Sequence, residues 1–321
     1  MKTASIYQPI EAGMLQVEES LRAVYKLDFS PLAEIVEHVL RPKGKRIRPA
    51  LALLAGKFHN YNLDLLIPMA TGVELLHTAT LVHDDTIDNS LVRRGTPTVN
   101  SLWSKSTAVL AGDYLFARAA DLVSTTDNVR VMRLFAQALM SVCNGELFQS
   151  FSTYDWQQTR QDYYARIGSK TAALFSLATE SGSVLSGAPE HAVQSLKSYG
   201  YNLGMAFQIV DDILDFTGEE QELGKPVGND LLQGVLTLPA ILFLEKYPEG
   251  NPIGDIFENR DKQEDWERVI ELISNSPVIV DSYRIAAEFC SLARQTLSNL
   301  PDSESRRSLI DLSDYVVARN R

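Results

Sequence analysis

Two short runs of aspartate are the residues in this sequence whose types and spacing could do chemistry. Residues 84–88 read DDTID and residues 211–215 read DDILD, so both follow the pattern D-D-x-x-D. Positions three and four apart are neighbours on a helix, where like charges destabilise it by about 0.2–0.5 kcal/mol per pair. Oxygen ligands suit a hard cation, and Mg²⁺ usually takes one or two carboxylates together with substrate phosphates. The runs therefore predict a divalent-cation site with six candidate ligands: Asp84, Asp85, Asp88, Asp211, Asp212 and Asp215.

The segments that must position these aspartates have the period of a helix. Followed backwards at helical spacing, the first run continues into Thr80 and His77, and the second continues into Gln208. Each stripe is charged at one end and becomes small or apolar below it. Two such helices facing each other would form a deep pocket with metal at its mouth. The simpler alternative is a pair of solvated acidic helix ends, which one run alone would not exclude.

Basic residues lie in loops close to the acidic runs. The segment GKRIRP at 44–49 places three cations at the start of a helix, where anions are favoured. Taken singly, each basic residue is most simply a solvated surface charge. Taken together they describe sites for two diphosphates, because Arg makes bidentate contacts to phosphate and Lys acts as a point charge. The candidates are Lys45, Arg48, Arg93, Arg94, Lys170 and Lys225.

The rest of the chain shows the helical period almost throughout. Residues 32–40, for example, carry an apolar stripe at positions i, i+3, i+4, i+7 and i+8. No run alternates in the manner of a strand, and Gly and Pro fall where helices would end. We therefore expect an all-α fold, with about ten helices in a single domain over residues 1–321.

Composition narrows the class of protein. The chain has 321 residues, 45% of them hydrophobic, which is ample for a large core. Its net charge of -11 argues against nucleic acid as a partner, because there is no basic footprint. The two cysteines, Cys143 and Cys290, imply no disulfide scaffold. Residues 1–19 lack the apolar region of a signal peptide, and no stretch has the roughly 18 uninterrupted apolar residues of a spanning helix, so we expect a cytoplasmic protein.

Five segments, taken in order, resemble the trans-isoprenyl diphosphate synthase family, also called polyprenyl synthetases. They are GKRIRP (44–49), LLHTATLVHDDTIDNSLVRRGTPT (75–98), IGSKTAALF (167–175), LGMAFQIVDDILD (203–215) and GKPVGNDL (224–231). The resemblance implies the all-α isoprenoid synthase type I fold, a helical bundle around a deep central cavity. It also implies three Mg²⁺ ions, a homodimer, and head-to-tail condensation of isopentenyl diphosphate with an allylic diphosphate to give a medium- or long-chain trans-polyprenyl diphosphate.

Carried over by motif, the resemblance assigns roles to individual residues. Isopentenyl diphosphate would be bound by Lys45, Arg48, His77 and Arg94. The allylic diphosphate would be contacted by Arg93, Lys170, Thr171, Gln208 and Lys225. The chief Mg²⁺ ligands would be Asp84, Asp88 and Asp211, supported by Asp85, Asp212 and Asp215. Arg93 and Lys170 would act with the chief metal ligands as the catalytic residues.

One position departs from the family pattern. Family members commonly have a Lys two residues before the Thr-Leu-Pro that ends this loop, and Val235 takes its place in this sequence. That Lys would be a further contact to diphosphate. The departure implies a weaker allylic site, with the metal chemistry unaffected.

The resemblance also bears on product length. Family enzymes that stop at farnesyl length often carry an aromatic residue four or five positions before the first aspartate, whereas Ala79 and Thr80 are small. An open path below Asp84 implies products longer than farnesyl. Candidates for the floor of that path are Phe116, Phe135 and Met140, each of which is as readily a core residue.

Two other functions fit part of this pattern. A class I terpene cyclase also uses an aspartate-rich motif and Mg²⁺, but its usual second motif, N-D-x-x-S-x-x-x-E, is absent from the sequence. A non-catalytic regulatory subunit of a heteromeric prenyl synthase tends to lose one aspartate cluster, whereas both are whole in this chain. The departure at Val235 keeps this second alternative open.

Overall fold

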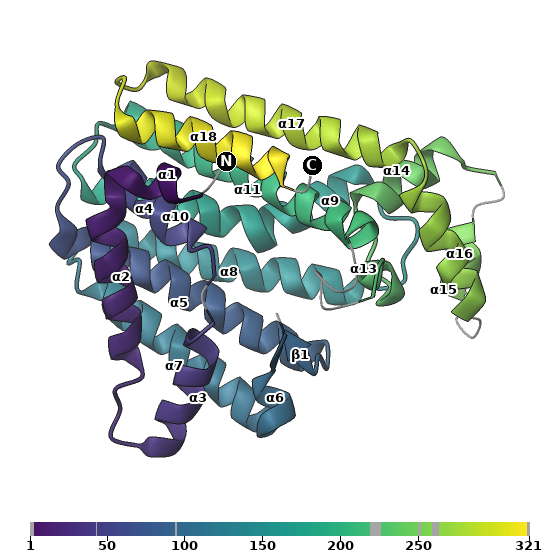
Figure 1. Ribbon diagram of the computed structural model, residues 1–321, viewed down its shortest axis with the longest axis horizontal. Helices are drawn as coiled ribbons and strands as arrows, with labels where there is room; N and C mark the ends of the chain where they lie inside the picture. The colour runs from purple at the N-terminus through teal and green to yellow at the C-terminus, as the bar shows by residue number, and fades with distance from the viewer. Residues whose placement is uncertain are drawn as a thin grey trace. The chain divides into compact units, whose positions relative to one another are not determined.

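Helices dominate the structure, a computed structural model that describes residues 3–42, 44–93, 95–218, 226–249, 252–258 and 263–319 (Figure 1). The prediction of an all-α fold is confirmed. Within those ranges the only strands are β1 (Val92–Arg93) and β2 (Thr96–Pro97), which pair antiparallel. The helices outnumber the ten or so expected, because several are single turns.

Contacts between Cα atoms divide the chain into two compact units, each assembled from three separate segments. The first unit contains Met1–Leu139, Leu174–Gly200 and Arg294–Leu312. The second unit contains Met140–Ala173, Tyr201–Ala293 and Ser313–Arg321. The single domain expected from the sequence stays a prediction.

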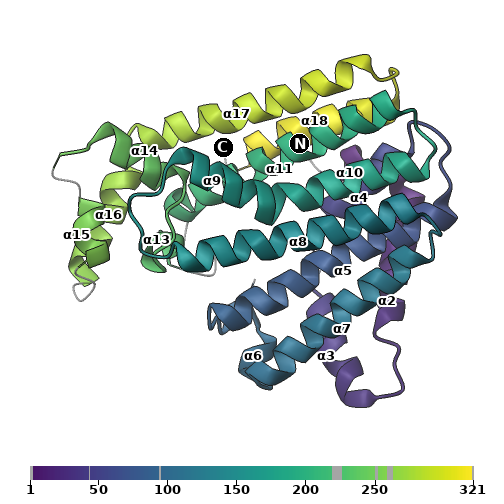
Figure 2. The ribbon, with the colours of Figure 1, turned by 180° about the vertical axis from the view of Figure 1, so that it is seen from behind.

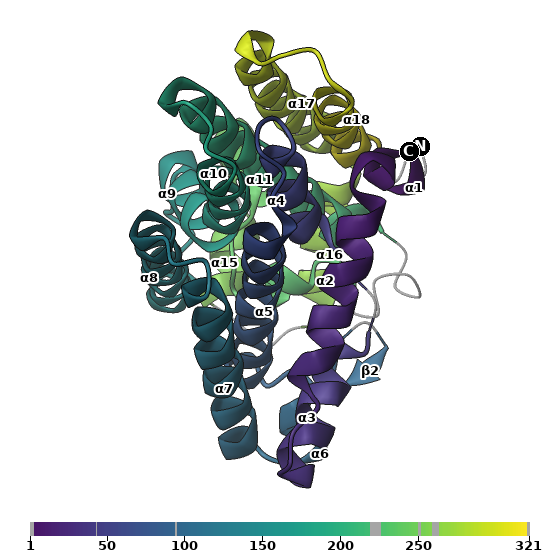
Figure 3. The same cartoon turned by 90° about the vertical axis from the view of Figure 1, so that its left-hand side faces the viewer.

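The first unit holds the helices of residues 3–124 together with several later ones. They are α1 (Thr3–Tyr7), η1 (Gln8–Ile10), α2 (Glu11–Val24), α3 (Ser30–Leu40), α4 (Ile47–Gly56), α5 (Leu63–Ile87), α6 (Val99–Leu102), α7 (Lys105–Ser124), the start of α8 (Val129–Phe151), α10 (Ala173–Leu185), the start of α11 (Glu190–Thr217), η3 (Leu297–Asn299) and most of α18 (Glu304–Ala318). Helix α5 packs against α2, α4 and α7 (Figure 3). It is therefore the core helix of this unit, and its last turn carries the first aspartate run.

Helix α5 is stabilised at its start and buried along most of its length. The Asn62 side chain accepts a hydrogen bond from the Asp64 N–H at 3.0 Å, which caps the helix. Among the described residues, α5 alone is long and apolar enough to cross a bilayer by length and composition. Since 61% of its most apolar stretch is buried inside the protein, the same property suits a core helix.

The second unit holds the remaining helices. They are the end of α8, α9 (Arg160–Ile167), η2 (Gly168–Ala172), the end of α11, α13 (Asn229–Leu232), α14 (Leu238–Lys246), α15 (Pro252–Glu258), α16 (Gln263–Ser274), most of α17 (Val278–Thr296) and the end of α18. Helix α16 packs against α14 and α15 (Figure 2). The chain passes from α9 into a π-helical turn, η2, without a break. Single π turns inside helices are frequent at functional sites, and this one carries Lys170 and Thr171.

Candidate active site

The first aspartate run lies at the C-terminal end of α5. Asp84 and Asp85 occupy the last turn, and Asp88 caps the helix, its N–H donating to the Asp84 carbonyl at 2.9 Å. A helix C-terminus carries a partial negative charge of about half a unit, and this one has no basic residue in its last turn. Three carboxylates at such an end repel one another and the helix dipole. The arrangement is stabilised by cations supplied from elsewhere.

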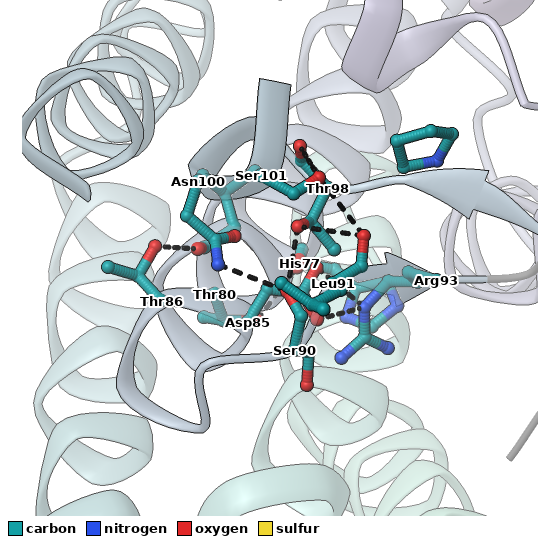
Figure 4. A network of polar contacts seen from close by, with 12 residues as sticks. His77, Thr80, Asp85, Thr86, Ser90, Leu91, Arg93, Thr98, Asn100 and Ser101 are labelled. Atoms are coloured by element: carbon teal, nitrogen blue, oxygen red, sulfur yellow. Dashed lines mark hydrogen bonds and ion pairs between the residues drawn. The ribbon is translucent and has the colours of Figure 1, made fainter. Parts of the chain in front are cut away.

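One of these cations is Arg93, from strand β1. Its Nε donates to both carboxylate oxygens of Asp85, at 2.8 and 2.9 Å (Figure 4). Burial raises the pKa of Asp85, and the Arg93 charge opposes that shift. Asp85 is buried, Asp84 is half-buried and Asp88 is exposed. Arg94, which the resemblance assigns to isopentenyl diphosphate, lies outside the described residues.

The loop that presents Arg93 is fixed by side-chain hydrogen bonds. The Thr98 hydroxyl donates to the Ser90 carbonyl at 2.7 Å, and the Asn100 amide donates to the same carbonyl at 3.0 Å (Figure 4). The Ser90 N–H in turn donates to the Asp85 carbonyl at 2.9 Å. Gly95, with φ of 74°, allows the reversal between the strands. The loop therefore places Arg93 beside the C-terminal end of α5.

His83, next to Asp84, sets how closely α5 approaches α7. Its Nε2 lies 3.0 Å from the Val109 carbonyl oxygen, and its ring meets Phe116 edge-on at 5.2 Å between centroids. A Cβ on Gly112 would lie only 2.1 Å from His83 Nε2. Gly112 therefore leaves the space that the His83 ring occupies. Phe116 is therefore packed beside the first cluster.

We expect Gly112→Ala to damage the first cluster, because the added methyl overlaps the His83 ring. Overpacking of this kind costs about 1–3 kcal/mol. Urea unfolding should show a lower midpoint, and kcat should fall as Asp84 moves with His83. Gly254→Ala is the matched control, since its methyl would lie 3.6 Å from the nearest atom, an ordinary contact. Equal behaviour of the two variants would contradict this account of Gly112.

The three cations around the start of α4, Lys45, Arg46 and Arg48, have different surroundings. Lys45 is exposed, and its carbonyl accepts from the Tyr7 hydroxyl at 2.8 Å. The Arg48 guanidinium lies over the Phe175 ring at 4.8 Å. Both are candidates to bind an anion, as the resemblance implies, and that role stays a prediction. His77, also assigned to isopentenyl diphosphate, is half-buried on α5, and its carbonyl accepts from the Thr80 hydroxyl at 2.7 Å.

Arg46 turns inward instead. Its Nε and Nη1 each lie 2.8 Å from a carboxylate, of Glu18 on α2 and of Glu74 on α5 respectively. Burial lowers the pKa of Arg46, but the two carboxylates outweigh that effect and raise it, so the guanidinium stays charged. Sequence reasoning missed this anchor. A single Glu74 inside the apolar run of α5 was the signal that could have revealed it.

The second aspartate run, in the last turns of α11, is mostly buried. The Asp211 side chain is 35% exposed and lies 2.9 Å from Arg319 Nη1. Asp212 and Asp215 are only 3% and 2% exposed. Asp215 Oδ2 accepts the Asp230 N–H at 3.0 Å, which ties the start of α13 to α11. Exposure therefore separates Asp84, Asp88 and Asp211 from the other three aspartates, along the same line as the roles implied by the resemblance.

Asp212 is the centre of a buried hydrogen-bond network. Its Oδ2 accepts from the Tyr163 hydroxyl at 2.6 Å, and its Oδ1 accepts from Gln208 Nε2 at 2.8 Å. The Thr171 hydroxyl donates to Gln208 Oε1 at 2.6 Å. Burial raises the pKa of Asp212 to about 7, with Asp230 adding to the shift and the two donors opposing it. Sequence reasoning found three members of this network and missed Tyr163.

Two further residues from the sequence prediction belong to the second unit. Lys170 forms an ion pair with Glu146 of α8. Val235, the departure from the family pattern, donates its N–H to the Asp230 carbonyl at 2.9 Å. The adjoining Leu236 carbonyl accepts from Arg166, a buried cation that no motif had suggested. Lys225 lies outside the described residues.

The residues proposed to control product length differ in burial. Ala79, Thr80 and Phe135 are buried, and Phe116 is half-buried. Met140 is 58% exposed on α8, which makes it unsuitable as the floor of a pocket in a single chain. That candidate is withdrawn for this physical reason, and the others stay predictions.

The fold and the two aspartate clusters are those of an all-helical, isoprenoid-synthase-type enzyme. Residues 30–273 match the model of a protein family described as "Polyprenyl synthetase". The heptaprenyl diphosphate synthase component 2 of Geobacillus stearothermophilus is 39% identical over 320 residues, covering 100% of both chains. A decaprenyl diphosphate synthase from Rhodobacter capsulatus has a TM-score of 0.93 at 38% identity, covering 100% of both chains.

A third comparison bears on metal. The polyprenyl synthase from Caulobacter crescentus CB15, complexed with calcium and isoprenyl diphosphate, has a TM-score of 0.94 at 32% identity, covering 100% of this chain and 98% of that one. The chain belongs to the polyprenyl synthetase family and is a trans-prenyltransferase that makes long-chain polyprenyl diphosphates. The family uses a divalent metal. The predictions of family, fold and enzyme class are thus confirmed.

Proposed function

We propose that this chain condenses isopentenyl diphosphate with an allylic diphosphate, head to tail, in a reaction that requires Mg²⁺. The observation that supports this most is the division of the aspartates by exposure. Asp84, Asp88 and Asp211 are half-buried or exposed, whereas the other three are buried. A metal-dependent prenyl transfer needs accessible carboxylates of this kind, and solvated acidic helix ends would not need Asp85, Asp212 and Asp215 buried behind them.

The donor set fits a hard cation because it consists of carboxylate oxygens. Asp84, Asp88 and Asp211 would hold the metal, with three Mg²⁺ ions proposed per site. Within the described ranges, no three His, Cys, Asp or Glu side chains converge as a ready-made cage. Such a site suits Mg²⁺, whose remaining ligands are commonly substrate phosphates and water. When bound, the metal neutralises charge on the departing diphosphate.

The cations of the chain do the rest of the electrostatic work. We assign Arg93 and Lys170 to the allylic diphosphate, and each is paired with a carboxylate that a more highly charged diphosphate can displace. Gln208, Thr171 and Lys225 complete that set. Lys45, Arg48, His77 and Arg94 are assigned to isopentenyl diphosphate. Fixed charges aimed at the leaving group lower the barrier to breaking the allylic C–O bond.

The carbocation formed by this step must be kept from water. Apolar and small side chains below Asp84, including buried Ala79 and Thr80, suit the growing tail. The new C–C bond forms between the allylic carbon and the double bond of isopentenyl diphosphate. The released diphosphate then accepts the proton that restores a double bond, so no protein base is required.

A single assay tests the proposal against its rivals. The purified chain alone is incubated with isopentenyl diphosphate, an allylic primer and Mg²⁺. Condensed polyprenyl diphosphates support a synthase, and a cyclic hydrocarbon supports a terpene cyclase. No turnover would mean that the chain acts only with a second subunit.

The relative named component 2 favours a second candidate, in which the chain works as part of an assembly. Along α8, Met140, Leu147 and Phe151 lie on one side of the helix and are all exposed. Apolar side chains in such a row suit a partner chain. We propose a second copy as the partner, and a different subunit is the alternative. Measuring the mass of the purified chain in solution separates a homodimer from a monomer that awaits another component.

Product length gives a sharper test of the open path. We expect Thr80→Phe and Ala79→Phe to shorten the product, because a ring one turn before Asp84 obstructs the growing tail. Chromatography of the dephosphorylated products measures the length. Thr80→Val, which keeps the size and loses only the hydroxyl bonded to the His77 carbonyl, should leave the length unchanged. Products of unaltered length from both Phe variants would remove the open-path explanation.

A further inference from the structure

We infer that Tyr163 is a positioning residue for the allylic diphosphate and that Asp212 serves as its buried anchor, not as a metal ligand. The inference rests on the proposed function, since it concerns residues assigned to that substrate. Tyr163 lies in α9, four residues before the start of the nearest family-like segment. It is fully buried, and its hydroxyl donates to Asp212 Oδ2 at 2.6 Å.

Both oxygens of Asp212 are committed within the protein. Tyr163 occupies Oδ2, and Gln208 Nε2 occupies Oδ1 at 2.8 Å. The side chain is 3% exposed, whereas Asp211 beside it is 35% exposed. Mg²⁺ loses its water reluctantly and demands octahedral geometry. A carboxylate held by two donors in the protein interior is therefore poorly placed to bind it, and the exposed Asp211 is the better ligand.

The position of Asp212 determines how Gln208 presents its amide. An amide nitrogen carries two hydrogens, and one of them is used on Asp212. The Gln208 oxygen accepts from the Thr171 hydroxyl at 2.6 Å, and a flipped amide would turn that oxygen toward the Asp212 carboxylate, so the present orientation of the amide is favoured. The second hydrogen of Nε2 is thereby directed as a donor, as an anionic phosphate oxygen requires.

The network therefore runs from Tyr163 in α9, through Asp212 and Gln208 in α11, to Thr171 in the π turn. Lys170 precedes Thr171 in that turn. A change at Tyr163 removes the donor to Asp212 and so disturbs the carboxylate that holds Gln208. It should alter binding of the allylic substrate and leave that of isopentenyl diphosphate unaffected.

The test compares two buried tyrosines. Tyr163→Phe removes the donor to Asp212, and Tyr199→Phe removes a donor to the Leu309 carbonyl at 2.6 Å in the other unit. Both variants lose one buried hydrogen bond, so both should unfold at lower urea concentration. Only Tyr163→Phe should raise KM for the allylic diphosphate, by about tenfold or more, with KM for isopentenyl diphosphate changed less than twofold. An allylic KM that stays at the wild-type value would overturn the inference.

A second comparison separates anchor from metal ligand. Calorimetry of inorganic diphosphate with Mg²⁺ needs no turnover. Asp211→Asn should raise the Mg²⁺ concentration needed for half-maximal binding about tenfold, and Asp212→Asn should change it less than twofold while weakening diphosphate binding. Equal shifts in both variants would show that Asp212 is a metal ligand. Failure of the wild-type chain to form condensed products, alone or with a second subunit, would refute the proposed function instead, which keeps the two failures distinct.

Discussion

Replacing Asp84 or Asp211 by Asn is expected to lower kcat by about 10²–10³-fold, the cost of removing one fixed electrostatic contact in an enzyme site. Both side chains are accessible, and each stands at a different aspartate run. Asn keeps the volume and removes the charge, so the fold should persist. In Asp84→Asn the helix should become more stable by about 0.3–1 kcal/mol, because a negative charge leaves the C-terminal end of α5. Steady-state kinetics and urea unfolding measure the two effects.

Loss of activity together with a gain of stability distinguishes a functional charge from a structural one. Asp121→Asn is the control, since Asp121 is exposed on α7. Among the described residues its side chain forms an ion pair with Arg118, three positions earlier on the same helix. That variant should keep kcat within twofold of the wild-type value. If Asp84→Asn unfolded at lower urea concentration than the wild type, the carboxylate would be part of the scaffold and the metal assignment would fail.

Local pattern was enough to predict the helices that carry the site. The stripe from His77 to Asp84 has helical spacing, and α5 follows it to Ile87. The two acidic runs were evident because three carboxylates within five residues oppose helix formation. For these features the sequence carries the physical cause directly.

Burial, in contrast, depends on residues distant in the sequence. The pattern D-D-x-x-D makes three aspartates look alike. Asp212 is nevertheless buried, and the Tyr163 hydroxyl that donates to it comes from a residue 49 positions away in the chain. Arg93 could be placed near the first run from a short loop, but the contact of its Nε with both oxygens of Asp85 depends on the reversal at Gly95. Arg46 was one of three cations in a short segment and had no assigned role, and only the fold brings Glu18 and Glu74 to it.

Replacing Glu74 by Ala is expected to destabilise the protein by about 3–5 kcal/mol, the largest stability change among these predictions. The substitution leaves the Arg46 guanidinium buried with one carboxylate fewer, and its remaining partner, Glu18, is partly exposed. Urea unfolding followed by circular dichroism measures the loss. The effect comes from the stranded charge and not from the lost attraction, because desolvation of an ion pair offsets much of its Coulomb energy.

The double variant Arg46→Met/Glu74→Leu tests that explanation. With both charges replaced by apolar side chains of similar size, most of the stability should return. Its KM for isopentenyl diphosphate should nevertheless differ from that of the wild type. Arg46 has a φ of 49°, a left-handed conformation that costs a non-glycine residue about 1–3 kcal/mol unless its surroundings hold it. The ion pairs hold Arg46, and it lies directly between Lys45 and Ile47, where α4 begins. The double variant should therefore be stable but have a raised KM for isopentenyl diphosphate, because Lys45 and Arg48 are no longer presented together. A stable double variant with the wild-type KM would show that Arg46 serves only the fold.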